Sequence, residues 1–420
     1  MKLIFLTAFI WSALIKADAQ LTRPLTIEDC YTLAHQNYPL IKKKEFISKS
    51  KEYSIENASK GYLPQLSING QATYQSDVTE IPIKIPNTII PTISKDQYKI
   101  YTEVNQTIFD GGIIKTKKRS IEANAAVEDQ NLEVELYSLK ERVNQLFFGI
   151  LLMKEQLVVT EIQKKDIQNG ITKTNAAITN GTALKSSSDV LQAELLKADQ
   201  HSMELKATQK AYLEMLSQFI NQSLDENSLF EKPGKISISQ NISRPELLLF
   251  DTEKKTIDVQ DELISAQNKP RVSLFVQAGY GRPALNMLKN DFAAYYIGGV
   301  RFNWQLSGFY TRKKEKALLE NNRKSIEIQN ETFLFNTINT LKQQKEEILK
   351  LQGLIKSDDQ IILLRNKIKN TAMAQLEYGV INSSDYLREV NAEAGAKQSQ
   401  LLHEIQLLKA QYDQQTTSGN

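Results

Sequence analysis

The sequence contains an internal duplication, in which two copies of one pattern lie end to end. Each copy has two prolines 25 residues apart, followed further on by a glycine and an aspartate 77 residues apart. These landmarks are Pro39, Pro64, Gly112 and Asp189 in the first copy and Pro245, Pro270, Gly308 and Asp385 in the second. A repeat of this length predicts a fold built from two equivalent units.

The duplication also predicts the division of the chain. We expect a first repeat over residues 20–222, a second over 244–415 and a tail over 416–420. Residues 223–243, which contain Pro233 and Gly234, are expected to form the linker between the copies.

Residues 1–19 have the features of a secretory signal peptide. Lys2 is followed by a nearly continuous apolar run, and Ala17-Asp18-Ala19 provides small residues before a cleavage point at Gln20. The mature chain is therefore expected outside the cytoplasm. After residue 20 no apolar run reaches 18 residues, so no transmembrane helix is expected, although β-strands could still cross a membrane.

Alternating apolar and polar residues predict two strands in each copy. The expected strands are 64–76 and 98–109 in the first copy and 270–281 and 294–306 in the second. Each is long enough to supply the 9–11 residues that cross a bilayer when tilted. Aromatic residues gather near both ends, with Tyr74 and Tyr280 at one and Phe109 and Trp304 at the other, as in the two interfacial belts of membrane proteins. A soluble β-sandwich is the alternative, although four strands are few for a chain of this size.

Long helices are expected after each pair of strands. No proline occurs from Ile113 to Thr179, and apolar residues there alternate at spacings of four and three, which predicts a left-handed coiled coil. This seam is formed by Leu132, Leu136, Leu139, Val143, Leu146, Ile150, Met153 and Leu157. In the second copy Leu341, Ile348, Ile355 and Ile362 repeat at seven. Turns near Gly181 and Gly379 lead into returning helices over 188–222 and 384–415.

Four strands cannot cross a membrane alone, because the edges of the sheet would expose unpaired backbone groups to lipid. They would have to close a barrel with other chains. Two chains would supply eight strands, whose side chains fill the interior, whereas three would supply twelve and leave a water-filled bore.

Composition argues against several classes of function. The 52 lysines and arginines nearly balance 49 acids, which disfavours a nucleic-acid partner. One cysteine and three scattered histidines suggest no metal site, and no common nucleotide-binding or hydrolase motif occurs. We therefore expect no catalytic residues, no metal and no cofactor. A secreted or periplasmic structural coiled-coil protein without transport function remains an alternative, and a periplasmic adaptor is a weaker one.

Several motifs, taken in order, resemble the TolC-type outer-membrane efflux proteins. They are the signal peptide, Gly61-Tyr62-Leu63-Pro64-Gln65-Leu66-Ser67 at the strand entry, Phe109-Asp110-Gly111-Gly112 at the strand exit, and Tyr378-Gly379 followed by Ser383-Ser384-Asp385-Tyr386-Leu387. The resemblance covers residues 25–412, essentially the whole mature chain. It implies a mainly α fold with a small β part, in which tandem-duplicated helical hairpins form a periplasmic α-barrel. The four strands of each chain would contribute to a trimeric 12-stranded transmembrane β-barrel.

The resemblance also implies a function and partners. The protein would be a homotrimeric exit duct in the outer membrane, in contact with its lipid and extending into the periplasm. It would serve a tripartite efflux or type I secretion system. The duct would receive substrates from a periplasmic adaptor (membrane fusion) protein and an inner-membrane pump of RND or ABC type.

Candidate site residues lie around the two helical turns. The family places acidic gate residues at the motif positions of Asp189 and Asp385, and Arg388 stands where a further acid can occur. The family also implies adaptor contact at Gly181, Thr182, Gly379 and Val380. A simpler interpretation makes both aspartates first-turn residues stabilised by the helix dipole, and both glycines ordinary turn residues.

Two basic runs follow the strand exits. Lys115, Lys117, Lys118 and Arg119 form the first, and Arg312, Lys313, Lys314 and Lys316 form the second. A solvated helix face is one interpretation, and contact with anionic lipid headgroups is the other. The first copy has 48 residues from Pro64 to Gly112, against 38 from Pro270 to Gly308 in the second. Residues 77–97 contain most of this insertion and are expected to form an extracellular loop.

Overall fold

The structure is a computed structural model, and it describes residues 23–80, 82, 92–234, 236 and 241–420. The predicted signal peptide and part of the loop expected over 77–97 lie outside the described residues. The chain divides into two compact units, and each unit takes segments from both copies of the duplication.

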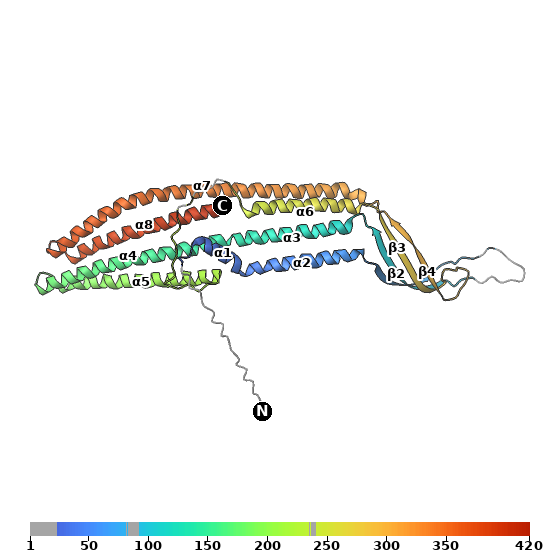
Figure 1. Cartoon of the computed structure of the whole chain (residues 1–420), viewed down its shortest axis with the longest axis horizontal. Helices are drawn as coiled ribbons and strands as arrows, with labels where there is room; N and C mark the ends of the chain where they lie inside the picture. The colour runs from blue at the N-terminus through green and yellow to red at the C-terminus, as the bar shows by residue number, and fades with distance from the viewer. Residues whose placement is uncertain (1–22, 81, 83–91, 235, 237–240) are drawn as a thin grey trace, which may run out of the picture. The chain divides into compact units, whose positions relative to one another are not determined.

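Among the described residues, the first unit consists of 23–38, 139–234, 236 and 342–416. It contains α1 (Ile27–Asn37), α4 (Leu139–Thr179) and α5 (Lys185–Ile220), together with part of α7 (Gly308–Glu377) and most of α8 (Ser383–Ser418). Helices α4 and α5 form one hairpin, and α7 and α8 form the equivalent hairpin of the second copy (Figure 1). The expected duplication of helical hairpins is confirmed.

A cluster of buried apolar residues forms the main core of this unit. Val143, Leu146, Phe147 and Ile150 of the predicted seam region lie in it, together with residues of α1, α5 and α8. The linker also joins the core, because Leu25 forms a parallel bridge with Phe230. The Phe230 ring lies edge-to-face against Phe147, with 5.5 Å between ring centroids. The linker is therefore anchored by its aromatic side chain as well as by backbone pairing.

The second unit consists of the described residues of 39–138, together with 241–341 and 417–420. Its helices are α2 (Lys43–Ser59), α3 (Ile113–Tyr137) and α6 (Pro245–Gln267), with the first part of α7 and two short 3₁₀ segments, Pro39–Lys42 and Lys60–Tyr62. Helix α3 packs against both α2 and α6. These helices lead directly into a sheet, so their ends position the strands.

The sheet has four antiparallel strands in the order β1-β2-β3-β4. They are β1 (Gln65–Tyr74), β2 (Asp96–Phe109), β3 (Arg271–Arg282) and β4 (Ala293–Asn303). Each overlaps the expected segment, and the strand ends differ from the expected ones by up to three residues. The expected fold class, mainly α with a small β part, is confirmed.

Two details of the helices differ from the prediction. The helix expected to continue from Ile113 to Thr179 is interrupted at Ser138, which separates α3 from α4. The Ser138 hydroxyl donates a hydrogen bond to the carbonyl of Glu135 (2.7 Å), a local bond that competes with regular helix geometry. The second copy has no such break, and α7 continues for 70 residues. Helix α8 extends to Ser418, so most of the expected tail is helical.

None of the described helices contains a stretch long and apolar enough to cross a membrane.

Candidate functional site

The register of the sheet separates its side chains into an apolar face and a polar face. Residues paired across neighbouring strands point to the same side of a sheet, so the even-numbered residues of all four strands share one face. The large apolar side chains on that face are exposed: Leu66, Ile68, Ile100, Val104, Leu274, Val276, Tyr280, Tyr296, Val300 and Phe302. Ile68, near the middle of β1, is 73% exposed. Within the described chain nothing covers this apolar face.

A β-bulge extends the apolar face at the end of β2. Thr107 pairs with Ser273, but Phe109 pairs with Val272, so Ile108 is an additional residue in β2. Without the bulge, Phe109 would point to the polar side with the other odd-numbered residues. The bulge therefore turns an aromatic side chain toward the same side as the apolar residues.

The opposite face is mostly polar and includes an ion pair across three strands. An Arg301 nitrogen lies 2.8 Å from a Glu103 carboxylate oxygen, and the Gln277 amide donates a 2.6 Å hydrogen bond to the same carboxylate. The Arg301 guanidinium also lies 4.5 Å from the centre of the Phe275 ring. Arg301 is thus held in place on the polar face by charge, hydrogen bonding and a cation–π contact.

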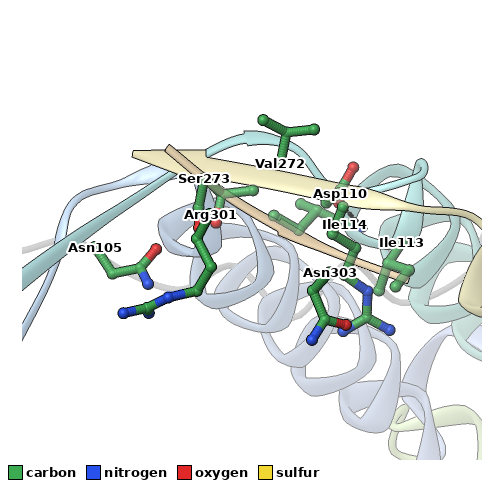
Figure 2. Close-up of a pocket in the computed structure, with 10 residues that line it drawn as sticks. Asn105, Asp110, Ile113, Ile114, Val272, Ser273, Arg301 and Asn303 are labelled. Atoms are coloured by element: carbon green, nitrogen blue, oxygen red, sulfur yellow. Dashed lines mark hydrogen bonds between the residues drawn. The ribbon is translucent and has the colours of Figure 1, made fainter. Parts of the chain in front are cut away.

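A cavity of about 360 Å³ opens beside these residues, at the helix-side end of the sheet. Figure 2 shows Asn105, Arg301 and Asn303 projecting to one side of the strands and Val272 to the other. Asp110 also lines the cavity, and its carboxylate accepts hydrogen bonds from the backbone N–H groups of Gly112 (2.8 Å) and Ile114 (2.7 Å). Asp110 therefore caps the start of α3 at the junction of strand and helix.

The four aromatic residues expected at the membrane interfaces lie near the strand ends. Tyr74 ends β1 and Tyr280 lies near the end of β3, at the loop side of the sheet. Phe109 ends β2 on the helix side. Trp304 was expected within a strand but lies one residue past β4, where its indole N–H donates to the carbonyl of Asn268 (3.1 Å). All four are exposed.

The two hairpin turns have the same backbone geometry. Gly181 and Gly379 have φ values of +73° and +71°, and each ends its helix in a Schellman motif. In the first turn the N–H of Thr182 bonds to the carbonyl of Ala177 (2.9 Å), and in the second the N–H of Val380 bonds to that of Gln375 (2.8 Å). The simpler interpretation of the glycines therefore holds for both: a positive φ favours a residue without Cβ.

The two aspartates are not equivalent in the structure. Asp385 is in the first turn of α8, where its N–H bonds to the side chain of Asn382 (2.9 Å). Asp189 lies one turn inside α5, because that helix already begins at Lys185. The expectation of a first-turn position is thus correct for Asp385 and wrong for Asp189. Asp189 follows Gly181 by eight residues, whereas Asp385 follows Gly379 by six. These two extra residues of the first copy lie in the helix, because the segments between the helices are equally long in both hairpins.

Arg388 contacts two acids on its own helix. Its guanidinium lies 3.5 Å from Asp385 and 3.1 Å from Glu389. Asp189, in contrast, has no ion pair with any described residue and is exposed. The two hairpins therefore carry different charge near their turns: a free carboxylate in one and a partly neutralised one in the other.

A buried charged cluster joins the two hairpins near the turns, and sequence reasoning missed it. The Lys369 ammonium lies 2.7 Å from Asp166 of α4 and 3.5 Å from Glu393 of α8. Lys397 lies 2.5 Å from Glu393, which is only 2% exposed. One signal was available, since Lys369 follows Ile362 by seven residues and so places a charge in an apolar seam.

The ionisation of Glu393 depends on this cluster. Burial alone would raise the pKa of Glu393, but the hydrogen bond from Lys397 and the charges of Lys369 and Lys397 outweigh it and hold the pKa below the ordinary value. Glu393 is therefore ionised at neutral pH, and removal of its partners would leave a buried charge without compensation.

Other reactive groups have structural surroundings. Burial raises the pKa of the Cys30 thiol to about 12, so the thiol stays protonated at neutral pH. His403 is paired with Asp358 at 2.6 Å between α7 and α8. Among the described residues, no three histidine, cysteine, aspartate or glutamate side chains are grouped so that they could hold a metal ion.

Comparisons with known proteins agree with this architecture. Residues 30–222 match the family of outer membrane efflux proteins. Among solved structures, the outer-membrane channel OprN is 12% identical with a TM-score of 0.67, over 94% of this chain and 89% of that one. The outer membrane protein VceC of Vibrio cholerae is also 12% identical, with a TM-score of 0.65 over 94% of this chain and 96% of that one.

The Campylobacter jejuni CmeC outer membrane channel is 12% identical, with a TM-score of 0.64 over 94% of this chain and 85% of that one. No curated protein sequence gives a significant match. The family and these structures are channels rather than enzymes. The resemblance found in the sequence is thereby confirmed: residues 30–222 match the outer membrane efflux protein family, and the fold is similar to that of solved outer-membrane channels.

Proposed function

We propose that this protein is the outer-membrane exit duct of a tripartite efflux or type I secretion system. The observation that carries the proposal is the sheet with an exposed apolar face, a polar reverse face and two edge strands, β1 and β4, whose outer edges pair with no other strand among the described residues. In water such a face would drive aggregation. In a membrane it would lie against lipid, and the polar face would line an aqueous path.

The open edges of the sheet favour a closed assembly of several chains. Unpaired backbone groups in lipid cost several kcal/mol each, so β1 of one chain must pair with β4 of another. Three chains would supply twelve strands and leave a bore wide enough for water and solutes, whereas the eight strands of a dimer would be filled by side chains. A homotrimer is therefore the assembly that agrees best with transport.

The helical hairpins would lie in the periplasm. At the turns Thr182 and Val380 are exposed, and a Cβ added at the preceding Gly181 or Gly379 would meet no atom within 4 Å. The backbone at both turns is therefore accessible, which supports contact with the helical end of a periplasmic adaptor. An inner-membrane pump of RND or ABC type would deliver the substrate through that adaptor. A structural coiled-coil protein without transport function would have no use for the two-faced sheet.

Size and conductance measurements test the proposal. The protein purified from membranes in mild detergent should have the mass of three chains and should form ion-conducting channels in planar lipid bilayers. A water-soluble monomer that forms no channels would contradict the proposed function.

Asp385→Ala should weaken the preference of these channels for cations, by roughly twofold or more. In a trimer, Asp189 and Asp385 would contribute six carboxylates near the periplasmic end, and the substitution would also release Arg388 from its 3.5 Å contact. Single-channel recordings in salt gradients measure the change. Glu226→Ala, an exposed acid of the linker, is the matched control. If conductance and ion preference stay unchanged in Asp385→Ala, Asp385 is not a gate residue.

A further inference from the structure

Positive charge is concentrated at one end of the sheet. Residues 110–119 and 307–316, which follow β2 and β4, contain eight lysines and arginines and only two acids, Asp110 and Glu315. The whole chain has an excess of only three positive charges. Residues 75–95 and 283–292, which connect the strands at the other end, contain three lysines and three acids. The excess charge therefore belongs to the helix side of the sheet.

Ion pairs inside the chain do not account for most of this charge. Arg119 pairs with Glu262 of α6, and Lys316 lies 2.8 Å from Asp261 of the same helix. The other six cations have no ion-pair partner among the described residues, and we call them the basic collar: Lys115, Lys117, Lys118, Arg312, Lys313 and Lys314. Cations close to a helix start are disfavoured by the helix dipole, so they need another stabilising partner.

The basic collar directly follows the aromatic end of the apolar face. Phe109, Trp304, Phe309 and Tyr310 are all exposed between the strand ends and the collar. Aromatic side chains of this kind lie at the headgroup level of a membrane. Lysine and arginine side chains placed just beyond them extend to the level of the lipid phosphates.

We infer that the basic collar binds the anionic headgroups of phospholipids in the leaflet that faces the helices. The inference rests on the proposed function, because it requires the apolar face to lie in lipid. Attraction between the collar and anionic headgroups would fix how deeply the strands sit and which end faces the periplasm. It would weaken with salt, because exposed charges are screened.

Trp304 provides a natural reporter for this contact. The sequence has two tryptophans, and the other one, Trp11, lies within the predicted signal peptide. Trp304 is 47% exposed and follows β4 directly, eight residues before Arg312. The tryptophan fluorescence of the mature protein would therefore come from Trp304 alone, and it would report on the lipids next to the basic collar.

The experiment uses vesicles of phosphatidylcholine with a minor share of phosphatidylglycerol, in which one of the two lipids carries bromine on its acyl chains. Bromine quenches tryptophan fluorescence on contact. At low salt, the quenching of Trp304 fluorescence per mole of brominated lipid should be at least about twofold greater for phosphatidylglycerol than for phosphatidylcholine. The preference should disappear at about 1 M salt, where the screening length falls to about 3 Å.

Substitutions assign the preference to the collar. Arg312→Gln/Lys313→Gln/Lys314→Gln should remove it, and Lys115→Gln/Lys117→Gln/Lys118→Gln should reduce it. The control Lys206→Gln/Lys210→Gln/Lys356→Gln, three exposed lysines of the helical hairpins, should retain it. Quenching by brominated phosphatidylcholine shows in each case that the variant is folded and inserted.

Two outcomes separate failure of the collar from failure of the proposed function. Equal quenching by both lipids in the unaltered protein, or an unchanged preference in both collar variants, would overturn the lipid-binding collar and leave the channel proposal intact. No quenching by either lipid would place Trp304 away from the bilayer and would overturn both.

Discussion

Ile68→Arg should remove the protein from the outer membrane. Ile68 lies near the middle of β1 on the apolar face and is 73% exposed. An arginine at the bilayer midplane of a transmembrane strand costs about 2–4 kcal/mol, and each of the three chains of a trimer would bear that cost. We expect most of the variant to be lost from the outer-membrane fraction and little trimer to be recovered in detergent.

Asn69→Arg is the matched control. Asn69 is the next residue of the same strand and points to the polar face, where Glu103 and Arg301 are already tolerated. We expect this variant to reach the membrane in nearly normal amount. If Ile68→Arg is also recovered there in normal amount, the apolar face does not lie against lipid and the proposed function is wrong.

Tyr386→Ala should destabilise the helical hairpins by about 3–5 kcal/mol, as other large buried aromatic residues do when truncated. Tyr386 is 1% exposed and packs among apolar residues of α4, α5 and α8. Its hydroxyl donates a 3.0 Å hydrogen bond to the carbonyl of Asp166. The substitution would therefore leave a cavity and remove a side-chain hydrogen bond to that helical carbonyl. A lower midpoint in urea denaturation, followed by circular dichroism, would measure the combined loss of stability.

Two further tyrosine variants separate the contributions. Tyr378→Ala, eight residues earlier at the same turn, removes a side chain that is 84% exposed and should change stability by no more than about 0.5 kcal/mol. Tyr386→Phe keeps the packing and removes only the hydrogen bond, which is worth about 1 kcal/mol. Equal effects of Tyr386→Ala and Tyr378→Ala would show that the packing around Tyr386 does not stabilise the hairpins.

Much of the fold follows from patterns that act over a few residues. The alternation in 271–282 and 293–303 marks strands because neighbouring side chains of a strand point to opposite sides. The apolar seam in 132–157 marks a packed helix because residues three and four apart share a face. Gly181 and Gly379 mark turns because a helix commonly ends in a residue with positive φ.

The candidate site was less accessible from the sequence. The motif around Asp189 and Asp385 is the same, yet only Asp385 lies in a first turn, because the helix start depends on where the chain leaves the turn. The cluster of Lys369 with Asp166 and Glu393 joins three helices, and two of its members are 203 residues apart. No local pattern specifies such a contact.

The sequence by itself determined the duplication, the order of helices and strands, the turn glycines and the two-faced character of each strand, because these depend on neighbouring residues. Only the tertiary structure decided the strand register that joins four short apolar stripes into one face, the bulge that adds Phe109 to it and the burial of Glu393 among cations. Those features depend on residues far apart in the chain, and their energies exist only after the chain has brought the residues together.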